Sequence, residues 1–124
     1  MNYIEDYGEF SEESVKWLIK SSEYNIKDAL YFLGLSYSYL EDYSNAEINL
    51  LASLSDERYD HKDKVEIYYQ LAENYRNWND QKSKYVEALK YYDKILNNSY
   101  NMTLLMEEDV LRSYLNTAYL TNRF

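Results

Sequence analysis

The sequence predicts an all-α protein of about six helices. The chain of 124 residues contains no proline and only 2 glycines, so it has few residues that interrupt helices or form tight β-turns. Apolar residues recur at the i, i+3, i+4 and i+7 spacing of a one-sided helix, and no segment alternates as a half-buried strand does. Without cysteine, the chain can form neither a disulfide framework nor a thiolate zinc site. The length fits a single domain over residues 1–124.

Three helices are predicted in the first half of the chain, after an acidic segment at 1–10. The first follows Ser11, a good N-cap, and ends near 24–25. The second covers about 27–40 and the third about 44–54. Gly34 lies in mid-helix, where we expect it to allow the close approach of a neighbouring helix. The residues expected to face inward are Val15, Leu18, Ile19, Leu30, Leu33, Gly34, Tyr37, Ala46, Leu50 and Ser53.

Three further helices are predicted in the second half, at about 61–78, 82–96 and 103–121. The polar stretches 55–60, 77–81 and 97–101 separate them. Their expected inward residues are Val65, Tyr68, Leu71, Ala72, Tyr75, Tyr85, Ala88, Leu89, Tyr92, Ile95, Leu96, Leu104, Leu111, Tyr114, Leu115 and Ala118. Trp78, at a helix end beside polar residues, is expected to be more exposed than Trp17.

Two stretches of the chain are self-similar. Leu30, Leu33, Gly34 and Tyr37 are followed by Ala46, and Tyr68, Leu71, Ala72 and Tyr75 are followed by Ala88. This order of large, large, small and tyrosine residues, then alanine in the next helix, resembles the tetratricopeptide repeat. The stretch 15–23, Val-Lys-Trp-Leu-Ile-Lys-Ser-Ser-Glu, together with 28–37, resembles the related Sel-one-like repeat. The first family's terminal proline and the second family's glycine loop are both missing, so either family remains open, as does an unrelated six-helix bundle.

The resemblance covers about residues 14–97 of the repeat helices at 11–97, with 103–121 as a further first helix or a terminal cap. It implies a curved array of antiparallel helix pairs that acts as an adaptor or scaffold and binds a peptide or protein on its concave face. Taking Leu30, Tyr68 and Leu111 as equivalent positions, the outward residues of each first helix would line that face. These are Tyr31, Leu35 and Ser38, then Tyr69, Glu73 and Arg76, then Arg112, Asn116 and Tyr119. Tyrosines at helical spacing are also common in cores, and that reading stays open for Tyr31 and Tyr69.

The charge of the chain is concentrated in its first part. The formal net charge is -9, and residues 1–50 hold ten acidic and three basic residues. An acidic patch is expected at Glu5, Asp6, Glu9, Glu12 and Glu13. The patch serves either solubility or the attraction of a basic partner. The second use gives an alternative function, an acidic inhibitor of phage or bacterial origin that blocks the basic nucleic-acid-binding surface of a host enzyme. Direct nucleic-acid binding by this chain is not expected.

No residue pattern indicates catalysis, a metal or a cofactor. Asp56, Asp60, His61 and Asp63 are close in sequence but lack the acidic ladder and turn glycine of a calcium loop. The consecutive acids 107–109 fan around their helix, so they do not form an acid/base pair. No secretory signal or membrane span is evident, which predicts a cytoplasmic protein. The last helix, 103–121, lacks a partner helix, so its apolar side must be covered by the preceding pair, by a second copy or by a partner. We expect self-association to a homodimer through this helix.

Overall fold

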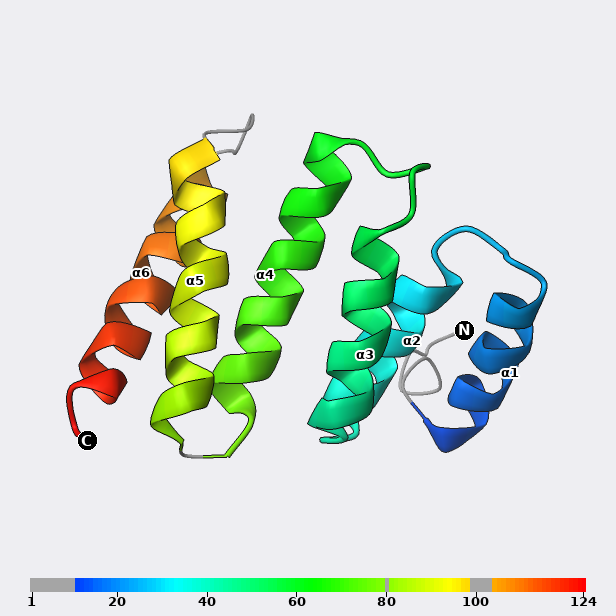
Figure 1. Cartoon of the computed structure of the whole chain (residues 1–124), viewed down its shortest axis with the longest axis horizontal. Coiled ribbons are helices and arrows are strands. Elements are labelled where there is room, and N and C mark those ends of the chain that lie inside the picture. Colours follow the sequence, from blue (N-terminus) through cyan, green and yellow to red (C-terminus); the bar gives the residue numbers. More distant parts are fainter. Residues whose placement is uncertain (1–10, 80, 99–103) are drawn as a thin grey trace. The chain divides into compact units, whose positions relative to one another are not determined.

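The computed structural model describes residues 11–79, 81–98 and 104–124, and within them it contains six α-helices and no strand (Figure 1). The helices are α1 (Glu12–Glu23), α2 (Ala29–Tyr39), α3 (Tyr43–Leu54), α4 (His61–Asn77), α5 (Lys82–Asn98) and α6 (Leu104–Thr121). The all-α prediction is therefore confirmed. The chain forms two compact units, of which the first ends at Arg58 and the second begins at Tyr59.

The helix ends follow from local hydrogen bonding. The Ser11 hydroxyl oxygen accepts from the Ser14 amide at 3.2 Å and caps α1, as predicted. The helix ends at Glu23 with Tyr24 as its C-cap, and a loop with left-handed backbone at Asn25 (φ 57°) and Asp28 (φ 74°) leads to α2. Asn and Asp tolerate this conformation better than most residues. These two residues set the bounds of the loop and explain why α2 begins after Asp28.

In the first unit, α2 packs against both α1 and α3. The two helices α2 and α3 approach closely at Gly34, where an added Cβ atom would lie 2.6 Å from the Leu50 Cγ. The expected role of this glycine is therefore confirmed. Ala46, Leu50 and Ser53 of α3 are buried, as predicted. The expected inward set of α1 is partly wrong: Val15 is buried, Leu18 is half-buried and Ile19 is exposed.

In the second unit, α5 packs against both α4 and α6. A capping box starts α4, because Asp60 and Asp63 each accept from the other's backbone amide. The fully buried residues common to the prediction and the structure are Leu71, Ala72, Ala88, Tyr92 and Ile95. Ile67 and Asn74 are also buried, which the sequence pattern did not predict.

The predicted inward face of α6 is partly wrong, although Tyr114 and Ala118 are half-buried. Val110 and Thr117 are buried, whereas Leu111 and Leu115 are exposed. The two sides of this helix are almost equally apolar, so periodicity alone could not choose between them. Thr117 can be buried because its hydroxyl donates to the Ser113 carbonyl within the same helix, at 2.7 Å. Leu111 is thus unsuitable as the third anchor of the repeat register.

None of the described helices combines the length and the hydropathy that crossing a membrane requires.

Candidate functional site

Three of the predicted partner-binding residues form one stripe on α4. Tyr69, Glu73 and Arg76 follow the i, i+4, i+7 spacing, and all three are half-buried. The Glu73 carboxylate joins two of the helices: its Oε1 accepts from Arg76 Nη2 at 2.9 Å, and its Oε2 accepts from the Tyr92 hydroxyl of α5. The carboxylate therefore holds the guanidinium in place on one side and the phenol on the other.

Tyr69 connects this stripe to the two neighbouring helices. Its ring lies edge-on to the Tyr92 ring, with 6.3 Å between the centroids. Burial and the nearby charge of Glu73 raise the pKa of Tyr69, although a side-chain hydrogen bond with Ser113 of α6 acts in the opposite direction. The Asp109 carboxylate of α6 adds to the increase. We use the name α4 cluster for Tyr69, Glu73, Arg76 and Tyr92.

The charge state of the α4 cluster follows from its surroundings. Burial, together with the hydrogen bond to Glu73, raises the pKa of Tyr92 well above its ordinary value. Burial acts to lower the pKa of Arg76, but the hydrogen bond and charge of Glu73 outweigh it and the pKa is raised. At neutral pH the cluster thus presents neutral phenols and a cationic guanidinium. Within the described part of the chain, Arg76 Nε is buried and has no hydrogen-bond partner.

The predicted residues of α6 are exposed. Arg112 Nη1 donates to Asp109 at 3.1 Å on the helix surface, and Asn116 and Tyr119 extend from the same surface. The structure shows no bond between these three residues and the α4 cluster. Ser113 makes that connection instead, through its side-chain hydrogen bond with Tyr69. This residue was not predicted, because a single serine in a helix carries no pattern.

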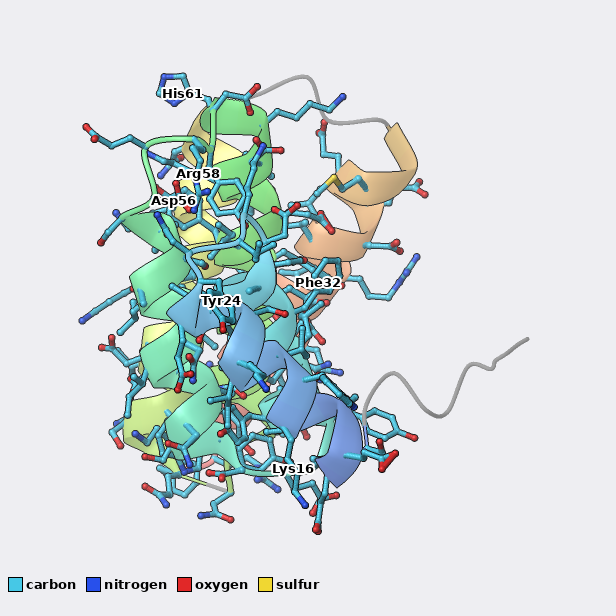
Figure 2. All side chains as sticks on the ribbon, turned by 90° about the vertical axis from the view of Figure 1, so that its right-hand side faces the viewer. Lys16, Tyr24, Phe32, Asp56, Arg58 and His61 are labelled. Carbon is cyan, nitrogen blue, oxygen red and sulfur yellow. The ribbon has the colours of Figure 1, made fainter. Side chains whose placement is uncertain are left out.

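In the first unit, the predicted residues Tyr31, Leu35 and Ser38 are half-buried on α2. The Tyr31 ring lies edge-on to Phe32, at 5.6 Å between centroids, and Phe32 itself is exposed (Figure 2). Tyr31 is therefore partly covered, which is intermediate between a core position and a surface position.

Of the predicted acidic patch, Glu12 and Glu13 are exposed in the first turn of α1. Glu5, Asp6 and Glu9 lie outside the described residues. Anions in the first turn are favoured by the partial positive charge of the helix N-terminus, which gives these two carboxylates a role within α1 itself.

A second polar cluster joins two loops of the first unit by hydrogen bonds. Arg58 lies beside Asp56 (Figure 2) and donates to both of its carboxylate oxygens, with Nη2 to Oδ2 at 2.7 Å. Arg58 Nη1 also donates to the backbone oxygen of Asn25 at 3.1 Å. These bonds lower the pKa of Asp56 to about 2. Because Arg58 and Asn25 are far apart in sequence, this cluster ties the α3–α4 loop to the α1–α2 loop. The bonds give it a structural role.

No group of three or more histidine or acidic side chains in the described ranges is arranged to hold a metal ion.

The aromatic residues of α4 and α5 form a row of stacked rings. Trp78 stacks on Tyr75 with 6.2 Å between the ring centroids, and Tyr75 stacks on Tyr91 with 5.8 Å between the ring centroids. Tyr68 continues the row beside Tyr91 at 6.0 Å, and the Lys84 ammonium lies 3.6 Å above the Trp78 ring. Trp78 is therefore half-buried. It is less exposed than Trp17, whereas the sequence pattern predicted that Trp78 would be the more exposed of the two.

Comparison with protein-family models, with curated proteins and with solved structures found no match for this chain. The fold and the α4 cluster therefore define an all-α protein with a polar and aromatic surface stripe, and its function is argued from those features.

Proposed function

We propose that this protein is a non-enzymatic protein-interaction module made of helix pairs of the tetratricopeptide or Sel-one-like kind. The pairs are α2 with α3 and α4 with α5. Support comes from the small residues at equivalent positions of the two pairs. Gly34 and Ala72 are both buried in the first helix of their pair, and Ala46 and Ala88 are both fully buried in the second. A small residue at both places allows close helix packing, which is the physical basis of the resemblance.

The observation that carries the binding role is the half-buried stripe of Tyr69, Glu73 and Arg76, which forms the accessible part of the α4 cluster. Tyrosine and arginine are enriched among residues that dominate binding energy, because they combine contact area with hydrogen-bonding tips. Glu73 holds Arg76 in one orientation, so less side-chain entropy is lost when a partner binds. The guanidinium has five donors, of which one on Nη2 is bonded to Glu73 and the one on Nε is buried, so the remaining Nη donors suit acceptor oxygens. We therefore infer a peptide or protein segment that offers carbonyl or carboxylate oxygens beside Tyr69.

A peptide-selection experiment tests this proposal. Random peptides displayed on phage are selected against the full chain, and the enriched peptides are titrated by fluorescence anisotropy. We expect Tyr69→Ala and Arg76→Ala each to weaken binding about 10- to 30-fold, the loss typical of an anchor residue. Lys62→Ala, an exposed cation on the same helix, is the matched control and should bind as the native chain does. Equal affinity of all three variants would contradict the assignment of this surface.

A second function is supported by the exposed acids of α1. An inhibitor that occupies a basic surface would use Glu12 and Glu13, together with the acids of the segment 1–10. Its binding would weaken steeply as the salt concentration rises from about 50 to about 500 mM, because exposed charges are screened. Two results together would favour this function over the first. The selected peptides would be strongly basic, and they would bind the Glu12→Gln/Glu13→Gln variant more weakly than the native chain but bind Arg76→Ala as well as the native chain.

A further inference from the structure

We propose that the outer face of α6 is the interface of a two-fold symmetric, antiparallel dimer of this chain. Leu111, Leu115 and Tyr119 follow each other at i, i+4 and i+8, so they form one continuous row on the helix surface. They are 42%, 65% and 70% exposed. Contiguous apolar surface of this kind on a helix is a feature of interaction sites.

The described part of the second unit covers this row only in part, at Leu111, and leaves Leu115 and Tyr119 mostly exposed. The opposite side of α6, with Val110 and Thr117, packs in the interior of the unit. The row therefore consists of the residues that the unit leaves out of its own core. Tyr119, which the repeat resemblance placed on the partner-binding face, belongs to this row and not to the α4 cluster.

The charges at the two ends of the row identify the occupant. Continuing the spacing by four residues in each direction leads to Glu107, which is exposed in the first turn, and to Arg123, which is exposed just beyond the helix end. The row thus has an acid at one end, a base at the other and apolar side chains between them. Two such rows are complementary when they run antiparallel, because each acid then lies near the other copy's base. Parallel alignment would place like charges together.

The packing of such a pair follows from the same register. Antiparallel alignment places Leu115 against Leu115 of the second copy and Leu111 against its Tyr119. Interdigitation of rows spaced by four residues is the commonest mode of helix packing and has a crossing angle of about -50°. The interface uses the same residues on both copies, so it closes at two and does not propagate.

The first test measures mass in solution by analytical ultracentrifugation of the full chain over a range of concentrations. We expect a concentration-dependent monomer–dimer equilibrium. Leu115→Glu should give a monomer, because the symmetric contact brings two buried carboxylates together. Ile48→Glu is the matched control: Ile48 is 59% exposed on α3, so its substitution should leave the dimer intact. Circular dichroism of both variants checks that the exposed substitutions preserve the helices.

A charge exchange tests the antiparallel register. Glu107→Arg and Arg123→Glu should each weaken dimerisation roughly 5- to 30-fold, because two symmetric ion pairs are lost and like charges meet. The double variant restores both pairs with exchanged signs and should regain most of the native affinity.

Three outcomes would overturn the proposal. These are a native chain that stays monomeric at every concentration, assembly beyond a dimer, and a double variant no better than the single ones. The proposal is independent of peptide binding, since Tyr69→Ala should leave the dimer unchanged.

Discussion

Replacement of Gly34 by alanine gives the sharpest test of how the first helix pair is held together. A Cβ atom at this position would lie 2.6 Å from the Leu50 Cγ, 2.8 Å from its Cδ2 and 3.3 Å from its backbone nitrogen. Carbon atoms pack favourably at about 3.5–4.0 Å, so the first two distances are strong overlaps. Leu50 is fully buried, and its Cγ is close to the backbone, so the side chain cannot simply rotate away.

The expected effect is the balance of two terms. Alanine is favoured over glycine inside a helix by about 1 kcal/mol. Overpacking of a well-packed core costs about 1–3 kcal/mol. Because the overlap involves the Cγ and because the backbone of α3 is also close, we expect a cost in the upper part of that range. Gly34→Ala should therefore lower the free energy of unfolding by about 1–2 kcal/mol.

Urea unfolding followed by circular dichroism measures this change. Leu50→Ala alone should cost about 2–5 kcal/mol, since it opens a cavity at a fully buried site. In the double variant the new methyl group occupies part of that cavity, so the double loss should be smaller than the sum of the single losses by about 1 kcal/mol or more. A stabilising Gly34→Ala, as helix propensity alone predicts, or strict additivity of the two changes, would refute the close-packing argument.

Two further predictions concern pH. Tyr92→Phe removes the hydroxyl that donates to Glu73 and should lower stability by about 1–3 kcal/mol at neutral pH, measured by urea unfolding. The folded state raises the pKa of Tyr92, so it keeps this proton where the unfolded chain loses it. Native stability should therefore fall as the pH rises above about 10, and the fall should be smaller in Tyr92→Phe, whereas equal alkaline curves would contradict this assignment. The pKa of Asp56 is lowered from 3.8 to about 2, so its contribution is present above pH 3.8 and is lost as the pH falls through about 2. Thermal unfolding of Arg58→Met should show less acid sensitivity than the native chain over that range, and an unchanged profile would show that the Arg58 bonds do not hold Asp56.

The positions of the helices were predictable because they depend on local signals. Ser11 and the capping pair at the start of α4 mark helix starts in the sequence itself. The loop between α1 and α2 was less well bounded: α2 was expected from about residue 27 and begins at Ala29, because Asp28 adopts a left-handed conformation. Asparagine and aspartate tolerate that conformation without requiring it, so their presence alone does not place a loop end.

The orientation of α6 and the bonds of the α4 cluster were not predictable in the same way. α6 has two apolar sides, and contact with α5 selects the one that contains Val110. The bond between Glu73 and Tyr92 joins residues 19 apart on two helices, so it depends on the rotation of α5 against α4. The stripe of Tyr69, Glu73 and Arg76 was expected from the register of the repeat resemblance, but the connections that hold it could not be predicted.

The placement of the two tryptophans gives the chain a built-in optical readout. Trp17 lies in the first unit and is 67% exposed, whereas Trp78 lies in the second, stacks on the Tyr75 ring and also contacts the Lys84 ammonium. Their indole emission should differ in wavelength and in quenching, because one ring is largely in water and the other is packed. In a chain that keeps only one tryptophan, fluorescence follows the melting of a single unit. Coincident melting curves would mean that the units unfold as one cooperative block, and separate curves would mean that each half has its own stability.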